Sequence, residues 1–202
     1  MGYTAIIDYG VGNLKSVANA MAYLGLETRV TGDAGEVERA DAVILPGVGA
    51  FPDAADRLRR TGLDRVVKAQ AGRKPILGIC LGMQLLLEES DEVRPTPGLG
   101  LIPGRVERIP TQLKLPHIGW NSLTFPNPCP LFQGLEEEAW VYFVHSYCAV
   151  PARPEQVAAA TDYGVPVTAA VCSGTVFGCQ FHPEKSGETG LQILRNFGGL
   201  NR

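Results

Sequence analysis

Long apolar runs are missing from this sequence, and so is any cluster of basic residues. No stretch approaches the ~20 apolar residues that a membrane-spanning helix needs, so we expect no transmembrane segment. No basic segment followed by an apolar one precedes the first strand-like residues, which indicates no signal peptide and predicts a cytoplasmic protein. The net charge of −3, without a run of Lys or Arg, argues against nucleic acid as the main partner.

Metal-binding patterns are absent as well. The chain has three histidines, and no cysteine or carboxylate cluster stands near them at the spacing of a zinc site. Its five cysteines form no Cys-x-x-Cys pair, and an odd number does not suggest a disulfide framework. We therefore expect free thiols, no metal and no cofactor.

The length and the order of apolar segments predict one α/β domain over residues 1–202. Short apolar strands alternate with helices in the first half, which is typical of a mostly parallel sheet covered on both faces. The second half changes to strands that follow one another, typical of antiparallel hairpins, and ends in a helix at Gly187–Phe197. The expected fold is a flavodoxin-like mixed sheet with antiparallel C-terminal strands. The expected strands are Thr4–Tyr9, Leu26–Val30, Ala42–Leu45, Ile76–Ile79, Trp140–Val144, Val157–Ala160, Val167–Val171 and Val176–Phe181.

Cys80 lies between a predicted strand and a predicted helix, in the pattern G-x-C-x-G formed by Gly78, Cys80 and Gly82. A sharp strand-to-helix turn of this kind lifts a nucleophile clear of the sheet, and the glycines make room for the crossing backbone. The amino end of the helix favours a thiolate, and the Leu81 N–H is placed to stabilise an oxyanion. We predict that Cys80 is a nucleophile, whereas the other four cysteines suit inert positions.

His182 is the predicted base. It is followed by Pro183 and Glu184, and in an extended chain residues two apart point to the same side, so Glu184 can orient the imidazole ring. On its own this pair is also typical of a strand end at the surface. His117 and His145 are alternative bases that lack a carboxylate close in sequence.

A glycine-rich segment follows the third predicted strand. Gly47 and Gly49 permit backbone conformations that are closed to other residues, so an amide can turn toward a ligand. We predict that the Val48 N–H supplies a second oxyanion donor. An ordinary strand-to-helix turn remains the alternative.

With these three motifs, the chain resembles the class I (triad) glutamine amidotransferases over essentially its whole length. The strings GICLGMQ and CQFHPEKSG, at Cys80 and His182, carry the resemblance. It implies that L-glutamine is hydrolysed to glutamate and ammonia by Cys80, His182 and Glu184. It also implies that the substrate is bound by Gly47, Gly49, Gln84, Ser146 and Tyr147.

Further strings resemble one branch of that family, the glutaminase subunits of histidine biosynthesis. They are DYGVGNL, PGVGAF, HIGWNSL and YFVHSY. This resemblance implies a heterodimer with a cyclase subunit that has a (β/α)8 barrel. That partner would use the ammonia to make imidazole glycerol phosphate and aminoimidazole carboxamide ribotide.

The branch resemblance places Asn13, Trp120 and Lys185 near the partner interface. A helix N-cap, a core aromatic and a solvated charge are the respective alternatives. The family often has a histidine at the position of Ala50.

Three other functions stay open at this point. A glutaminase subunit could serve anthranilate, purine or pyridoxal phosphate synthesis instead. A cysteine hydrolase of the intracellular-peptidase type would place its base soon after the nucleophile, unlike His182. A flavodoxin-like scaffold domain would leave Cys80 and His182 unexplained.

Overall fold

The computed structural model describes residues 2–136 and 138–200. The strands are β1 (Thr4–Ile7), β2 (Thr28–Thr31), β3 (Ala42–Gly47), β4 (Ile76–Cys80), β5 (Glu89–Ser90), β6 (Thr96–Pro97), β7 (Gly104–Arg108), β8 (His117–Ser122), β9 (Trp140–His145), β10 (Tyr147–Pro151), β11 (Val157–Asp162), β12 (Pro166–Ser173) and β13 (Val176–Cys179). The α-helices are α1 (Leu14–Tyr23), α2 (Ala34–Arg39), α3 (Phe51–Arg60), α4 (Leu63–Gln70), α5 (Leu81–Leu85) and α6 (Gly187–Gly199), and the 3-10 helices are η1 (Pro130–Phe132), η2 (Pro154–Gln156) and η3 (Pro183–Lys185). Of the helices in these ranges, none has the length and apolar character that crossing a bilayer requires.

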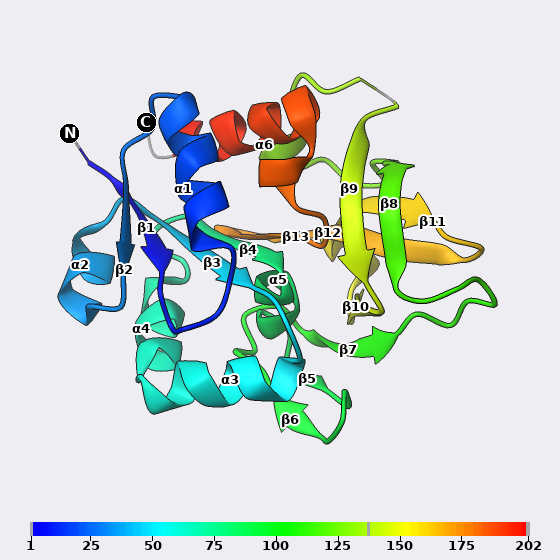
Figure 1. Cartoon of the computed structure of the whole chain (residues 1–202), viewed down its shortest axis with the longest axis horizontal. Helices are drawn as coiled ribbons and strands as arrows, with labels where there is room; N and C mark the ends of the chain where they lie inside the picture. The colour runs from blue at the N-terminus through cyan, green and yellow to red at the C-terminus, as the bar shows by residue number, and fades with distance from the viewer. Residues whose placement is uncertain (1, 137, 201–202) are drawn as a thin grey trace.

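A seven-stranded sheet forms the centre of the molecule, in the order β11-β12-β13-β4-β3-β1-β2 (Figure 1). Strands β2, β1, β3, β4 and β13 run parallel to one another, and β12 pairs antiparallel with both β11 and β13. The predicted mixed, mostly parallel sheet with antiparallel C-terminal strands is therefore confirmed. One detail differs from expectation: β13 belongs to an antiparallel hairpin, yet it also joins β4 in parallel.

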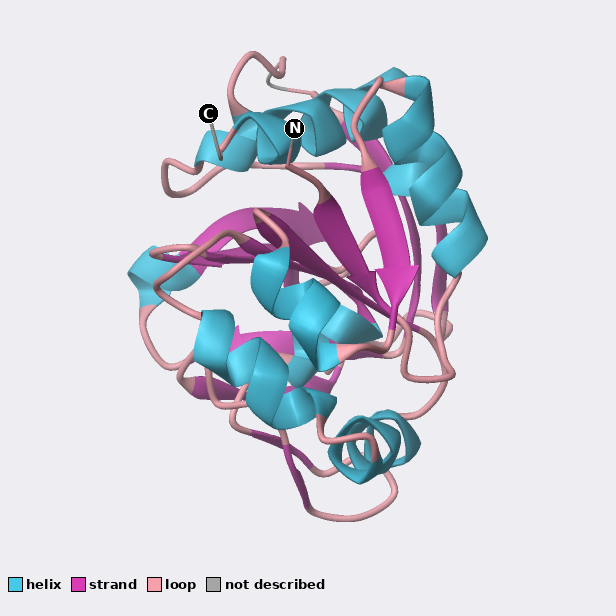
Figure 2. Cartoon of the chain, turned by 90° about the vertical axis from the view of Figure 1, so that its left-hand side faces the viewer, coloured by secondary structure: helices cyan, strands magenta, loops and turns pink. Residues whose placement is uncertain are grey.

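Helices cover both faces of this sheet (Figure 2). Because side chains alternate along a strand, Ala5 and Ile7 pack on one face with α2, α3, α4 and α5, whereas Ile6 packs on the other face with α1 and α6. All three side chains are fully buried. The near-continuous apolar strands of the sequence follow from this burial on two sides.

Two smaller sheets lie beyond the central one. Strands β10, β7, β5 and β6 form one, and β8 pairs antiparallel with β9 to form the other. The sequence pattern missed β5, β6, β7, β8 and β10, because these strands are short or carry exposed and polar residues that break the apolar alternation. They matter here because β9 and β10 bring the YFVHSY segment to the edge of the central sheet.

The helix after Cys80 is short. Helix α5 ends at Leu85. The third strand is longer than expected and reaches Gly47, where it pairs with Cys80. This pairing places the glycine-rich segment directly beside the predicted nucleophile.

Candidate active site

Cys80 occupies the sharp turn that the sequence predicts. It is the last residue of β4, it precedes α5, and its backbone has φ 54° and ψ −113°. A non-glycine residue in this region is strained, and such strain persists where the surrounding structure enforces it. Cys80 is 7% exposed, so its side chain is buried except for the surface that meets a cavity.

The glycines around Cys80 are required by close backbone contacts. A Cβ on Gly82 would lie 1.8 Å from the carbonyl oxygen of Leu45, and a Cβ on Gly78 would lie 2.6 Å from the carbonyl oxygen of Gly82. On the neighbouring strand, a Cβ on Gly47 would lie 2.8 Å from the Gly82 nitrogen. The turn therefore packs against β3 with no space for side chains.

The start of α5 supplies free backbone donors beside the sulfur. Leu81 is its first residue, and the first N–H groups of a helix have no partner within it. Because α5 has five residues, the local N–H groups dominate any field at Cys80, and a long-range helix dipole contributes little.

His182 and Glu184 meet through a turn rather than an extended strand. Strand β13 ends at Cys179, and Pro183 begins η3, so the expectation of an extended chain across Pro183 is wrong. The 3-10 turn brings Oε1 of Glu184 to 2.8 Å from Nδ1 of His182. Their side chains are 1% and 3% exposed, respectively.

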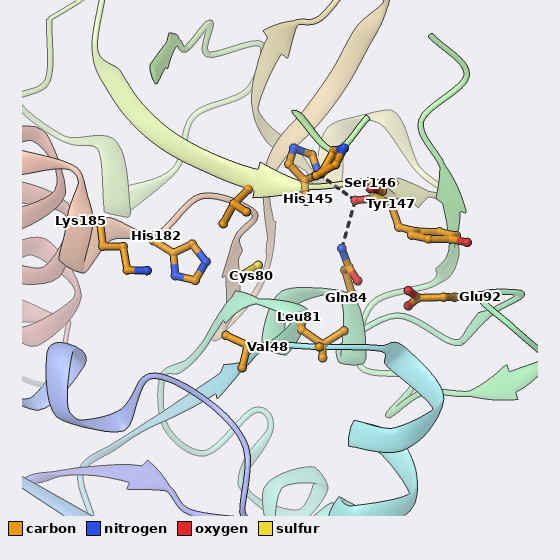
Figure 3. A pocket seen from close by; sticks show the side chains of 13 residues that line it. Val48, Cys80, Leu81, Gln84, Glu92, His145, Ser146, Tyr147, His182 and Lys185 are labelled. Atoms are coloured by element: carbon orange, nitrogen blue, oxygen red, sulfur yellow. Dashed lines mark hydrogen bonds between the residues drawn. The ribbon is translucent and has the colours of Figure 1, made fainter. Parts of the chain in front are cut away.

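The backbone of His182 is fixed from both sides. Its N–H donates to the carbonyl of Tyr142 at 3.1 Å, and its carbonyl accepts from the Lys185 N–H at 2.9 Å. The hydroxyl of Ser186 also donates to that carbonyl at 2.7 Å and accepts from the Tyr142 N–H at 3.0 Å. With Nδ1 held by Glu184, the ring presents Nε2 toward Cys80 (Figure 3).

The protonation of His182 reflects this environment. Burial alone lowers its pKa, but hydrogen bonds and charge interactions with Cys80 and Glu184 outweigh it and raise the pKa to about 9. His182 is therefore protonated at neutral pH. A charged imidazole beside a sulfur is the arrangement that activates cysteine nucleophiles.

The other two histidines lie in different surroundings. His117 is stacked between Phe143 and Tyr163, with ring centroids 4.7 and 3.9 Å away, and burial lowers its pKa. Burial also lowers the pKa of His145, to about 4, and its Nδ1 lies 2.8 Å from the Tyr147 carbonyl. Of the three histidines, all within the described ranges, only His182 contacts a carboxylate.

A cavity of about 430 Å³ joins most of the predicted site residues (Figure 3). Nine of them line it: Val48, Gly49, Cys80, Leu81, Gln84, Ser146, Tyr147, His182 and Lys185. Gly47 and Glu184 lie behind this surface, against the Cys80 turn and the His182 ring, respectively. The cavity volume suits a small-molecule substrate.

Asn13 and Trp120 lie outside the cavity lining. Asn13 occupies the N-cap position of α1 without a side-chain capping bond. Trp120 is 53% exposed, so the alternative of a core aromatic is wrong. Lys185 is exposed at the cavity edge.

Two residues near Cys80 were missed from the sequence. Glu92 lines the cavity, but it stands in an acidic segment where no pattern distinguishes one carboxylate from the next. Gln180 is fully buried with its Nε2 3.7 Å from Sγ of Cys80. A signal for Gln180 was present, since a polar residue at the end of an apolar strand requires a buried partner.

The chain is similar in sequence to known proteins. The family model described as "Glutamine amidotransferase class-I" matches residues 5–199. The protein described as "Imidazole glycerol phosphate synthase subunit HisH" of Bacillus cereus (strain ATCC 14579) is 52% identical over 197 residues, which are 97% of this chain and 94% of that protein. A protein of the same description from Moorella thermoacetica is 50% identical over 199 residues, 98% of this chain and 95% of that protein.

Solved structures show the same fold at lower identity. A crystal structure described as a glutamine amidotransferase superposes with a TM-score of 0.76 at 23% identity, and the superposition covers 99% of both chains. At this identity the likeness concerns the arrangement of the sheet and its helices.

Proposed function

The chain belongs to the class I glutamine amidotransferase family, as a glutaminase subunit of imidazole glycerol phosphate synthase in histidine biosynthesis, and we propose that Cys80, His182 and Glu184 hydrolyse its glutamine. One observation carries the proposal: a cysteine on a strained turn shares a cavity with a histidine whose other nitrogen contacts a buried carboxylate. The family membership argues against a peptidase-type hydrolase and a scaffold domain.

The reaction begins with attack of the Cys80 sulfur on the side-chain amide carbon of glutamine. The N–H groups of Leu81 and Val48 stabilise the oxyanion that forms. His182 carries a proton at neutral pH, because its pKa is raised to about 9, and it donates that proton to the departing ammonia. The neutral His182 then takes a proton from water as that water attacks the thioester, which releases glutamate and restores the Cys80 thiolate beside a protonated His182.

The polar groups of the cavity fit the amino-acid end of glutamine. Glu92 carries the one carboxylate among the described residues of the cavity lining, and it binds the α-ammonium group of the substrate. The Phe51 N–H donates to Oε2 of Glu92 at 2.8 Å and holds this carboxylate in place. The rest of the amino-acid end of glutamine is bound by three other residues of the cavity lining, Gln84, Ser146 and Tyr147. Gly49 leaves space for the substrate beside Val48, and Gly47 supports this wall from behind by letting the Cys80 turn pack against β3.

The test of the nucleophile is the Cys80→Ala variant, assayed for glutaminase activity in complex with the cyclase subunit. We expect hydrolysis to be abolished and labelling by a reactive glutamine analogue to be lost. Cys172→Ala is the matched control, because Cys172 is another free thiol and does not line the cavity. Substantial turnover by Cys80→Ala would rule out its role as nucleophile.

An exposed apolar face supports the proposed heterodimer with a (β/α)8-barrel cyclase. Strands β8 and β9 turn alternate residues away from the core, and these side chains are Ile118, Trp120, Trp140, Tyr142 and Val144. Val144 also lines the cavity, so this face adjoins its mouth. A partner on this face would receive ammonia without passage through bulk water.

The three proposed interface residues surround the same region. The Trp120 ring comes within 3.9 Å of the position of a Cβ on Gly187, just beyond η3 and Lys185. Helix α1, which Asn13 precedes, contacts η3. Large exposed aromatic side chains dominate many interfaces, so Trp120→Ala should weaken partner binding by about 10-fold or more.

Isothermal titration with the cyclase subunit measures that binding. Val30→Ala is the control, because Val30 is 45% exposed on β2, the edge strand of the central sheet opposite β11. Unchanged affinity of the Trp120→Ala variant would place the interface elsewhere.

The partner also controls the rate of hydrolysis in this proposal. The glycine-rich segment holds the Val48 amide away from the site until the partner binds, so the chain alone should hydrolyse glutamine slowly. Equal glutaminase rates with and without the cyclase would contradict this activation.

The extent of the chain and its location form the last part of the proposal. The match to the family model over residues 5–199 supports a single glutamine amidotransferase domain over residues 1–202. Five free cysteines suit the reducing cytoplasm, which supports a cytoplasmic location.

A further inference from the structure

A fully buried glutamine lies directly behind the nucleophile. Cys179 on β13 pairs with Ile79 on β4, so the residues that follow these two, Gln180 and Cys80, lie side by side. Nε2 of Gln180 donates to Sγ of Cys80 at 3.7 Å. Oε1 of Gln180 accepts from Nε2 of Gln84 at 3.0 Å. Both ends of the Gln180 amide are therefore used within the site.

The surrounding hydrogen bonds fix which end of Gln180 faces the sulfur. The backbone carbonyl of Tyr147 can only accept, and it lies 2.8 Å from Nδ1 of His145 and 3.0 Å from Nε2 of Gln84. Gln84 must therefore turn its nitrogen toward Tyr147 and Gln180. The atom of Gln180 that meets this nitrogen must be its oxygen, which leaves the Gln180 nitrogen for Cys80.

We propose that Gln180 is a positioning residue that holds a hydrogen-bond donor against the Cys80 sulfur, in an orientation set by the Tyr147 carbonyl through Gln84. The inference rests on the proposed role of Cys80 as nucleophile. A donor at this position favours the thiolate over the thiol and holds the sulfur in one rotamer. An amide in the reverse orientation would place an oxygen against the sulfur and disfavour the thiolate.

The same series of hydrogen bonds links the cavity wall to the nucleophile. Gln84 and Tyr147 line the cavity, whereas Gln180 does not. Since both hydrogen bonds of the Gln84 amide nitrogen go to the protein, its Oε1 is left as an acceptor for the substrate. If Gln84 moved, its hydrogen bond to Oε1 of Gln180 would break, and the Gln180 amide could then turn over. Binding of the amino-acid end and the reactivity of Cys80 are thereby coupled.

The test replaces Gln180 by Met, which has similar size and no donor, and by Glu, which has the same shape and presents an acceptor. The pH midpoint of Cys80 alkylation by iodoacetamide is followed by peptide mass spectrometry, with the chain in complex with the cyclase subunit. For Gln180→Met we expect this midpoint to rise by about one pH unit, equivalent to about 1.4 kcal/mol. For Gln180→Glu we expect a larger rise.

Glutaminase kinetics over pH provide the second readout. At pH values below the alkylation midpoint, where the thiol form of Cys80 predominates, kcat/KM of Gln180→Met should fall by about 10-fold, the factor that one pH unit implies. The deficit should shrink as the pH rises, because alkaline conditions restore the thiolate. A purely structural defect would lower activity by the same factor at every pH.

Gln156→Met is the matched control, because Gln156 is 2% exposed and its amide donates to Ser173, away from the cavity. It should leave the alkylation midpoint unchanged. Gln84→Met should raise the midpoint by less than Gln180→Met, since it frees the Gln180 amide without removing it. If Gln180→Met does not fold, Gln180→Glu and Gln84→Met carry the test.

The two hypotheses fail in different ways. An unchanged alkylation midpoint in the folded Gln180 variants would overturn the role of Gln180, even if Cys80→Ala is inactive. Persistent hydrolysis by Cys80→Ala would overturn the proposed mechanism, whatever the alkylation experiment shows.

Discussion

Replacing Glu184 by Gln would remove the negative charge beside His182 and preserve the size of the side chain. Oε1 of Glu184 lies 2.8 Å from Nδ1 of His182, and both side chains are almost fully buried. An amide oxygen can still accept the hydrogen bond from Nδ1. The variant therefore isolates the charge from the geometry.

The magnitude follows from the pKa of His182. Burial lowers this pKa, yet Cys80 and Glu184 raise it from 6.5 to about 9. At 1.36 kcal/mol per unit of pKa, the protonated ring is stabilised by about 3 kcal/mol relative to an unfolded chain. Cys80 and Glu184 share this stabilisation of the charged ring, and a hydrogen bond to a charged group contributes about 1.5–3 kcal/mol.

The dependence on pH has a definite sign. A pKa that is raised in the folded state stabilises fully below the unfolded pKa of 6.5 and loses its effect as the pH passes about 9. Glu184→Gln should thus lower the free energy of unfolding by about 1.5–2 kcal/mol more at about pH 6 than at about pH 10.

Urea unfolding of both proteins at the two pH values measures this difference. Glu155→Gln is the control, because the Glu155 side chain is 65% exposed and pairs with Arg153. Its effect should be small and equal at both pH values, since exposed ion pairs contribute little. The same destabilisation by Glu184→Gln at both pH values would refute the charge interaction between Glu184 and His182.

Two further substitutions test the framework of the site. Gly82→Ala would place a Cβ 1.8 Å from the Leu45 carbonyl oxygen, so we expect a loss of about 3 kcal/mol or more in denaturant unfolding. Gly199→Ala should have little effect, because nothing lies within 4 Å of its Cβ position. Ser186→Ala removes the hydroxyl that bridges His182 and Tyr142. We expect about 1–3 kcal/mol of destabilisation and a lower kcat in the complex, because the Tyr142 N–H loses its acceptor and the His182 carbonyl keeps only the Lys185 N–H. Full activity of Ser186→Ala would show that the other contacts suffice to hold His182.

Much of the nucleophile turn could be predicted from sequence because its requirements are local. A residue with positive φ between a strand and a helix needs small neighbours, and Gly78 and Gly82 stand at the two positions where a side chain would strike backbone. The parallel half of the sheet was also predictable, since its apolar strands are short and separated by helices. Both features depend on residues close together in the chain.

The choice of base depended on tertiary structure. The sequence contains three histidines. The prediction that His182 is the base assumed an extended chain across Pro183, and the structure has a 3-10 turn there. Only packing shows that His117 is enclosed by Phe143 and Tyr163, and that His145 is bound to the Tyr147 carbonyl. These contacts join strands that are distant in sequence, so no local pattern encodes them.

The sequence by itself therefore determined the nucleophile turn, the class of fold and the family. The tertiary structure decided what surrounds the sulfur. Glu92 reaches the cavity from a run of acidic residues, and Gln180 reaches Cys80 because β13 lies parallel to β4 in a particular register. Strand pairing across a hundred residues is set by the burial of whole faces and not by local preference, which is why only the folded chain shows what these two residues contact.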